Sequence, residues 1–147
     1  MNRYTKILVA LDYSDHSDRV VERAEQLASV YEAELILVHV VEYLPPMVIG
    51  DEPFPSAVWT VDEEQLLENA REQMKVIAAR LSGQVVVQQV VLGNPRHELC
   101  ASARQHNADL MIAGSHGRHG IARLLGSTAA GLVHHTPCDL LLVRIAE

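Results

Sequence analysis

Cysteine is scarce in this sequence. Its 147 residues include two cysteines, Cys100 and Cys138, and they follow no C-x-x-C spacing. A chain of this length removes roughly 70% of its unfolded surface from water on folding, which is enough for a full hydrophobic core without disulfides or metal. We therefore interpret both cysteines as small core residues of a protein in a reducing compartment.

Long hydrophobic runs are also missing. The longest apolar stretches, such as residues 35–41, which include His39, are far shorter than the roughly 20 residues of a membrane-spanning helix. The N-terminus passes directly into a strand-like apolar segment and shows no apolar region followed by a cleavage site. We therefore expect a cytoplasmic protein with no membrane partner.

Basic residues are too few for a nucleic-acid-binding protein. The chain has 12 Lys and Arg against 19 Asp and Glu, a net charge of −7 with neutral histidines. Because non-specific affinity for nucleic acid comes mostly from cations that neutralise phosphates, we expect no nucleic-acid partner. The charge is uneven, since residues 1–94 hold seven basic and fifteen acidic side chains and residues 95–147 hold five and four. The C-terminal part can therefore accept one small anion.

What the sequence does contain is an alternation of two hydrophobic patterns. The apolar segments of strand length, rich in Val, Ile and Leu, are residues 6–11, 34–41, 84–92, 109–113 and 139–145. Near-continuous hydrophobicity over such lengths is typical of parallel strands buried on both faces. Longer amphipathic patterns lie between them. The alternation predicts a single-domain α/β fold over residues 1–147, a doubly wound five-stranded parallel sheet with helices on both faces. The strand order that we expect for this sheet is 3-2-1-4-5.

The amphipathic patterns have recognisable ends. We expect the first helix to be capped by Ser14 or Asp15. The second spans about residues 62–81 with a buried stripe that starts at Leu66. The third spans 95–106 with Pro95 in its first turn, and the fourth spans 127–135 and ends before Pro137. The proline-rich segment 43–60 is irregular, and loops of this length are usually functional or mobile. Its Trp59 either pins the loop to the body or contacts a ligand or partner.

Polar residues and glycines follow two of the predicted strands. In open α/β sheets, small ligands bind beyond the carboxyl ends of the strands where the strand order reverses. Asp12 follows the first strand, where it can accept hydrogen bonds from a ligand or cap the next helix. After the fourth strand, glycines 114, 117 and 120 recur at intervals of three, and Gly126 precedes the next helix. Both segments therefore belong to the edge where a ligand is expected.

The glycine segment has the chemistry of a phosphate site. Glycines let backbone N–H groups face an anion without an obstructing Cβ. The helix that begins at Ser127 and Thr128 adds the partial positive charge of its N-terminus. The segment is neither a P-loop nor a dinucleotide fingerprint, because no Gly-Lys-Ser/Thr follows and it does not come after the first strand. A tight turn without a ligand is the alternative interpretation.

These residues resemble the universal stress protein family. The resemblance covers essentially the whole chain and is carried by residues 7–14, by residues 37–40 and above all by Gly114-Ser115-His116-Gly117 with Gly126-Ser127. The ATP-binding branch of the family has the motif Gly-x2-Gly-x9-Gly-Ser/Thr, whereas eight residues separate Gly117 from Gly126 here. The resemblance implies that the chain binds ATP or AMP, and it leaves open whether Mg²⁺ accompanies the nucleotide. The shorter gap leaves the number of phosphates open.

The resemblance also implies which residues meet the nucleotide. Asp12 and Val40 lie with adenine and ribose, Ser127 and Thr128 hold phosphate oxygens, and Arg118 either contacts a phosphate or is a solvated loop residue. The expected nucleotide-binding residues are Ala10, Leu11, Asp12, Ser14, Val40, Ala113, Gly114, His116, Gly117, Arg118, Gly126, Ser127 and Thr128.

The family further implies a homodimer formed through the last strand, residues 139–145. A charge-poor apolar edge strand fits that role, because an uncovered one invites aggregation. We expect a stress-response sensor or regulator without efficient catalysis, since the candidates offer one carboxylate and the glycine loop has no lysine to support ATP hydrolysis. The alternative is a nucleotide-independent homodimeric interaction or signalling module.

The histidines do not predict a metal site. His116 and His119 are three residues apart and His134 adjoins His135, but no cysteine or carboxylate completes a ligand set at the usual spacing. His39 lies within an apolar strand, and we interpret it as a core imidazole with one hydrogen bond.

Overall fold

The computed structural model describes residues 3–42, 48–49, 52–53, 62–116 and 126–145. One parallel sheet is built from β1 (Lys6–Leu11), β2 (Glu34–Glu42), β5 (Val85–Gly93), β6 (Leu110–Gly114) and β7 (Asp139–Val143). The strands lie in the order β5-β2-β1-β6-β7, which confirms the predicted order 3-2-1-4-5 for these five strands. Their ends differ from the predicted ones by at most two residues.

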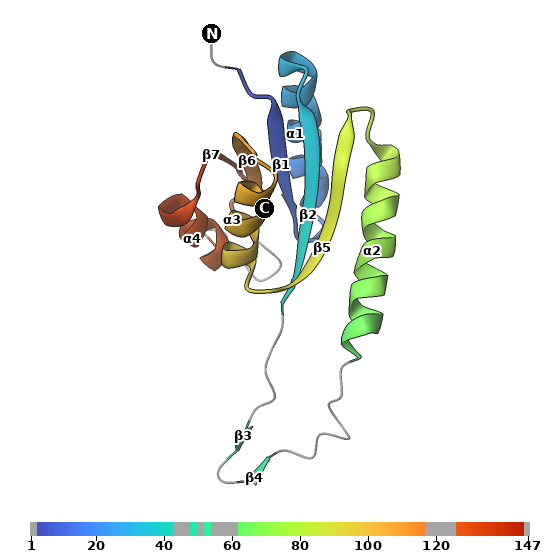
Figure 1. The fold of residues 1–147 in the computed structure, drawn as a ribbon, viewed down its shortest axis with the longest axis vertical. Helices are drawn as coiled ribbons and strands as arrows, with labels where there is room; N and C mark the ends of the chain where they lie inside the picture. Colours follow the sequence, from blue (N-terminus) through green and yellow to red (C-terminus); the bar gives the residue numbers. More distant parts are fainter. Residues whose placement is uncertain (1–2, 43–47, 50–51, 54–61, 117–125, 146–147) are drawn as a thin grey trace.

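Four helices connect the strands: α1 (Ser17–Tyr31), α2 (Glu63–Arg80), α3 (Pro95–Gln105) and α4 (Ser127–His135). α1 and α2 cover one face of the sheet, and α3 and α4 cover the other (Figure 1). The predicted α/β doubly wound architecture is confirmed. No helix in the described part of the chain has the length and hydrophobicity needed to cross a membrane.

The central strand β1 shows why both faces need helices. Ile7 and Val9 pack into the core under α1 and α2, and Leu8 packs into the core under α3 and α4. All three side chains are fully buried. Since successive side chains of a strand point to opposite faces, a strand that is apolar throughout must be covered on both sides.

The short strands β3 (Val48–Ile49) and β4 (Glu52–Pro53) pair antiparallel. They lie in the segment that we predicted to be irregular, so that prediction is wrong at these residues. β-Branched Val and Ile favour an extended backbone. The prolines around them led us to expect an irregular segment, so we did not use this local preference. Trp59 and the rest of the segment lie outside the described residues.

Side chains cap the starts of two helices. The Asp62 carboxylate accepts the Gln65 N–H at the start of α2 (3.3 Å), and the Asn94 side chain accepts the His97 N–H at the start of α3 (3.1 Å). The prediction for α1 is wrong, because its N-cap is His16 and no side chain caps it. The Ser14 hydroxyl instead accepts the N–H of His16 (3.3 Å), within the turn that precedes the helix.

The apolar stripe of α2 also differs at one end from the prediction. Ala70 and Met74 are buried, and Ile77 and Leu81 pack against the same core, as expected. Leu66, however, is 39% exposed. Its side chain lines the pocket described below and so belongs to a ligand-accessible wall rather than to the core.

The buried centre of β1 predicts a large stability effect. We expect Leu8→Ala to lower the free energy of unfolding by about 2–5 kcal/mol, because it leaves a cavity between β1 and the helices above it. Val30→Ala is the control, since Val30 is 75% exposed on α1 and its truncation should change stability by at most about 0.5 kcal/mol. Urea denaturation of the three proteins measures both values. Equal effects of the two substitutions would contradict the assigned core.

Candidate functional site

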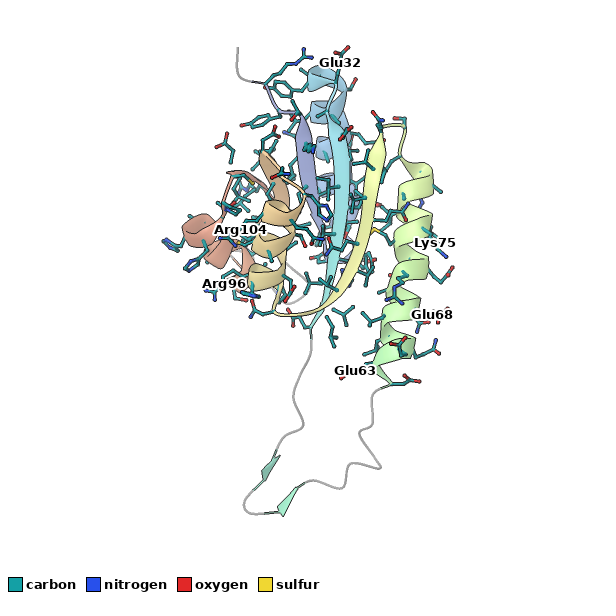
Figure 2. All side chains as sticks on the ribbon, viewed as in Figure 1. Glu32, Glu63, Glu68, Lys75, Arg96 and Arg104 are labelled. Atoms are coloured by element: carbon teal, nitrogen blue, oxygen red, sulfur yellow. The ribbon has the colours of Figure 1, made fainter. Side chains whose placement is uncertain are left out.

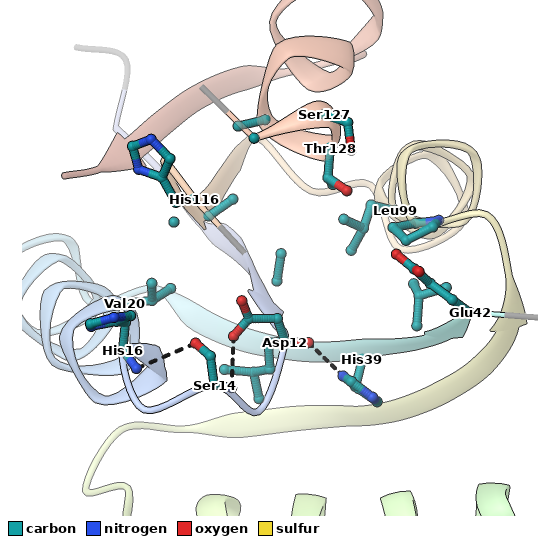
Figure 3. A pocket seen from close by; sticks show the side chains of 18 of the residues that line it. Asp12, Ser14, His16, Val20, His39, Glu42, Leu99, His116, Ser127 and Thr128 are labelled. Carbon is teal, nitrogen blue, oxygen red and sulfur yellow. Dashed lines mark hydrogen bonds between the residues drawn. The ribbon is translucent and has the colours of Figure 1, made fainter. Parts of the chain in front are cut away.

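A pocket of about 430 Å³ lies beyond the carboxyl ends of β1, β2 and β6 (Figure 3). Every expected nucleotide-binding residue that the structure describes lines it: Ala10, Leu11, Asp12, Ser14, Val40, Ala113, Gly114, His116, Gly126, Ser127 and Thr128. Gly117 and Arg118 lie outside the described residues. The fold therefore brings segments that are distant in sequence, the turn after β1 and the start of α4, to one cavity.

Asp12 shapes the first wall of the pocket. Its Oδ1 atom accepts the backbone N–H of Ser14 (3.0 Å) and the hydroxyl of Ser17 (2.9 Å), which closes the turn between β1 and α1. No hydrogen bond from the described part of the chain reaches Oδ2. One carboxylate oxygen thus holds the turn and the other is available to a ligand that carries hydroxyl or amino donors.

Tyr13 follows Asp12 in a left-handed backbone conformation, with φ 57°. This conformation costs a non-glycine residue roughly 1–2 kcal/mol, so other contacts must hold it. The Tyr13 hydroxyl donates to the Ala70 carbonyl of α2 (2.7 Å), and the ring stacks on His39 with centroids 3.7 Å apart. Burial raises the pKa of Tyr13 to about 12.

His39 is a core imidazole, as predicted from its place in an apolar strand. It is 9% exposed, and its Nδ1 lies 2.6 Å from the carbonyl oxygen of Leu11. Because a carbonyl only accepts, Nδ1 carries the proton of this hydrogen bond. His39 also lines the pocket, so the same ring fixes the end of β1 and forms part of the wall.

Ser115 fastens the opposite wall. Its N–H donates to Val143 (2.9 Å), its carbonyl accepts the Gly126 N–H (3.0 Å), and its hydroxyl oxygen accepts the Ile145 N–H (3.0 Å). The ends of β6 and β7 and the start of α4 are therefore joined at one buried residue. Sequence reasoning left Ser115 out of the site, because a serine after a strand carries no signal of these long-range bonds.

His116 leaves one ring nitrogen without a partner. The Ser115 hydroxyl oxygen accepts the Ile145 N–H, so its own hydrogen can be donated to His116 Nδ1, 3.0 Å away. Which of the two atoms donates depends on the imidazole tautomer. The other ring nitrogen, Nε2, is buried and has no hydrogen-bond partner in the described part of the chain. An unsatisfied buried donor or acceptor costs about 1–3 kcal/mol, which a partner atom on a bound ligand would recover.

The start of α4 forms the anion-attracting end of the pocket. Its N-cap is Gly126, which has no side chain to cap the helix, and no acidic residue occupies the first turn. The hydroxyls of Ser127 and Thr128 stand at this end (Figure 3). Free N–H groups and the helix dipole together suit a phosphate or carboxylate. Within the described lining there is no Lys or Arg.

Sequence reasoning missed several residues that also line the pocket: His16, Val20, Val41, Glu42, Leu66, Pro95, Leu99, Ala129 and Ile145. A positional signal exists for two of them, because Glu42 ends β2 and Pro95 begins the helix after β5. The rule that ligands bind beyond the carboxyl ends of the strands therefore also holds for the ends of β2 and β5, which we did not consider from the sequence. No pattern in the sequence separates Leu66 from the buried stripe of α2.

Metal binding finds no support among residues 3–42, 48–49, 52–53, 62–116 and 126–145. No group of three His, Cys, Asp or Glu side chains within these ranges is placed to hold a metal ion. His119 lies outside them.

The chain is a doubly wound α/β protein with a pocket at the carboxyl edge of its sheet, and comparison with known proteins identifies its family. The model of the universal stress protein family matches residues 3–144. The chain is 40% identical over 146 residues to universal stress protein A homolog 2 of Coxiella burnetii, an alignment that covers 99% of this chain and 98% of that protein. The chain belongs to the universal stress protein family.

Solved structures have the same fold. The universal stress protein UspA of Lactobacillus plantarum matches with a TM-score of 0.71 and 25% identity, over 98% of this chain and all of that one. A universal stress protein in complex with cAMP matches with a TM-score of 0.62 and 29% identity, over 97% of this chain and 98% of that one.

The half-buried Tyr13 side chain predicts a specific loss of stability at high pH. The folded chain keeps this proton to about pH 12, whereas an unfolded tyrosine loses it near 10. Folding therefore binds a proton in that range, so the stability that Tyr13 contributes below pH 10 falls as the pH rises from 10 to 12.

Urea denaturation between pH 9 and 12 measures this fall, and Tyr13→Phe should reduce it. The pKa of Tyr4 is also raised, mainly by its hydrogen bond to Asp139, so Tyr4→Phe serves as the reference variant. In tyrosinate absorbance, the ionisation near pH 12 should be absent from Tyr13→Phe and present in Tyr4→Phe. An unchanged titration in Tyr13→Phe would contradict the assignment.

Proposed function

We propose that this universal stress protein binds an adenine nucleotide in the pocket and acts as a nucleotide-dependent regulator in the stress response, without efficient catalysis. The observation that carries the proposal is the meeting of the free α4 N-terminus with the Asp12 carboxylate across one cavity. Its volume of about 430 Å³ lies within the roughly 300–1,000 Å³ of typical ligand sites.

The two ends of the pocket suit the two ends of a nucleotide. The N–H groups and hydroxyls of Ser127 and Thr128 are donors for phosphate oxygens. Asp12 Oδ2 is an acceptor for ribose or adenine donors. Val40 and Leu66 add apolar side chains to the lining, and apolar wall suits a planar base.

The relatives support an adenine nucleotide but leave its phosphate open. A solved universal stress protein 29% identical to this chain is in complex with cAMP. The choice here therefore includes a cyclic monophosphate beside ATP and AMP. With ATP, Mg²⁺ would be held mainly by the phosphates. Asp12 and Glu42 are the carboxylates that the described lining offers such an ion.

A regulatory role fits this lining better than turnover. Efficient phosphoryl transfer needs cations that stabilise the transition state and a group that positions the attacking water. In the described lining, the α4 N-terminus and neutral donors stand where such cations would act. We therefore propose at most very slow hydrolysis of ATP.

Calorimetric titration with adenosine, AMP, cAMP and ATP, with and without Mg²⁺, tests the proposal. We expect Asp12→Asn to weaken binding of all four ligands about tenfold, because the amide keeps the turn-closing oxygen and loses the acceptor that faces the pocket. The double substitution Ser127→Ala with Thr128→Val should weaken only the phosphorylated ligands.

Two exposed residues on α1 provide matched controls. Asp18→Asn and Ser29→Ala make comparable changes outside the pocket and should leave every affinity unchanged. If the wild-type chain binds none of the four ligands at millimolar concentration, the nucleotide proposal is wrong. If the double substitution affects adenosine as strongly as AMP, phosphate does not lie at α4.

We also propose a homodimer formed along β7. This strand is an edge of the sheet, its residues 140–143 are apolar and only half-buried, and Val133 of the neighbouring α4 is 49% exposed. The same observation favours the second candidate function, a homodimeric interaction module that needs no nucleotide.

Sedimentation equilibrium distinguishes these assemblies. We expect twice the 16.2 kDa mass of one chain, with and without nucleotide, because the edge strand lies apart from the pocket. A monomer at micromolar concentration would contradict the dimer. A dimer that binds no nucleotide would favour the interaction module.

A further inference from the structure

We infer that Tyr13 is a positioning residue for the pocket and that its hydroxyl couples ligand binding to helix α2. Tyr13 is absent from the pocket lining. The inference rests on the proposed nucleotide site and adds to it a residue that acts through Asp12 and a helix that responds to the ligand.

The first step is the bond between the turn and the helix. The Tyr13 hydroxyl donates to the carbonyl of Ala70, a buried residue near the middle of α2. The two residues are 57 positions apart in the sequence. Because Asp12 and Ser14 line the pocket on either side of Tyr13, a fixed Tyr13 ring fixes the backbone between them.

The second step is the stack beneath the turn. The Tyr13 and His39 rings are nearly parallel, with an interplanar angle of 17°, and His39 donates to the Leu11 carbonyl. The backbone is therefore held on both sides of Asp12, by β2 through Leu11 and by α2 through Tyr13. Together with the hydrogen bonds that Ser14 and Ser17 donate to Oδ1, these two contacts set the direction of Asp12 Oδ2.

The third step is the strain at Tyr13. A tyrosine with φ 57° persists only where its surroundings enforce it. Once the hydroxyl bond is lost, the turn can relax toward an ordinary conformation and carry the Asp12 carboxylate with it. Ligand affinity should therefore fall although no atom that contacts the ligand has changed.

Coupling of this kind works in both directions. A ligand that holds Asp12 also holds Tyr13, and so slows local opening of α2 around Ala70. The outer face of α2 presents exposed charged side chains, among them Glu63, Glu68 and Lys75 (Figure 2). The element that responds to the ligand is thus one that a partner can reach from solvent.

Tyr13→Phe tests the inference, with Tyr4→Phe as its matched control. Each substitution removes one hydrogen bond donated by a tyrosine hydroxyl, and the two bonds have similar lengths, 2.7 Å for Tyr13 and 2.8 Å for Tyr4. Tyr4 donates to Asp139 at the amino ends of the strands, whereas the pocket lies at their carboxyl ends. We expect Tyr13→Phe to raise the Kd for AMP about three- to tenfold. Tyr4→Phe should leave this Kd unchanged.

Amide hydrogen exchange in α2 supplies a readout that general destabilisation does not reproduce. AMP should slow exchange of residues 68–76 in the wild-type chain and in Tyr4→Phe, but not in Tyr13→Phe. A second variant, Tyr13→Gly, accepts the left-handed backbone without strain and should also lose this response.

The outcomes separate the two proposals. No AMP binding by the wild-type chain overturns the proposed nucleotide site. Binding by the wild type with an equal Kd and an equal α2 response in Tyr13→Phe overturns the coupling alone. Without any nucleotide, α2 should exchange faster in Tyr13→Phe than in Tyr4→Phe, and equal rates would also overturn the coupling.

Discussion

The position of β1 between β2 and β6 is the constraint on which the rest of the structure depends. The crossovers through α1 and α2 lie on one face of the sheet, and those through α3 and α4 lie on the other. The chain that leaves β1 and the chain that leaves β6 must therefore diverge, because each enters a helix on a different face. Their divergence opens the pocket, so the cavity follows from the topology before any polar side chain is placed.

A pocket between two turns keeps its shape only where contacts fix the conformation of both turns. The turn after β1 is fixed by side chains, through Asp12 Oδ1 and the Tyr13 ring, whereas the turn after β6 is fixed around Ser115, mostly through its backbone. Within the described part of the chain, Asp12 Oδ2 accepts no hydrogen bond, so the wall at β1 offers an acceptor. The opposite wall offers the donors of the α4 N-terminus.

The sequence predicted what local patterns encode. Strand-length runs of Val, Ile and Leu gave the sheet, and Gly126 before a helix pattern and Pro137 after it gave α4 with its observed ends. Contacts between distant residues left no such pattern. The Tyr13 hydroxyl donates to the Ala70 carbonyl, 57 positions away, and the Ser115 hydroxyl accepts the N–H of Ile145, 30 positions away. The turn that contains Tyr13 also places the start of α1 beyond Ser14, which we expected to cap this helix. The location of the pocket could therefore be predicted from the sequence. The long-range hydrogen bonds that hold its walls become visible only in the folded structure.

Charge limits which nucleotide the proposed site satisfies. A helix N-terminus contributes about half a positive charge, and the described lining adds the carboxylates Asp12 and Glu42 but no Lys or Arg. The half charge of the helix N-terminus is outweighed by the two carboxylates, so this lining would hold a phosphate through hydrogen bonds and not by neutralising its charge. The further charges of a triphosphate need cations from elsewhere. Mg²⁺ is one source, and Arg118 and Arg123 are the cations nearest in sequence to the start of α4. Among the adenine nucleotides proposed above, cAMP carries the lowest charge and therefore meets the least electrostatic repulsion from this lining.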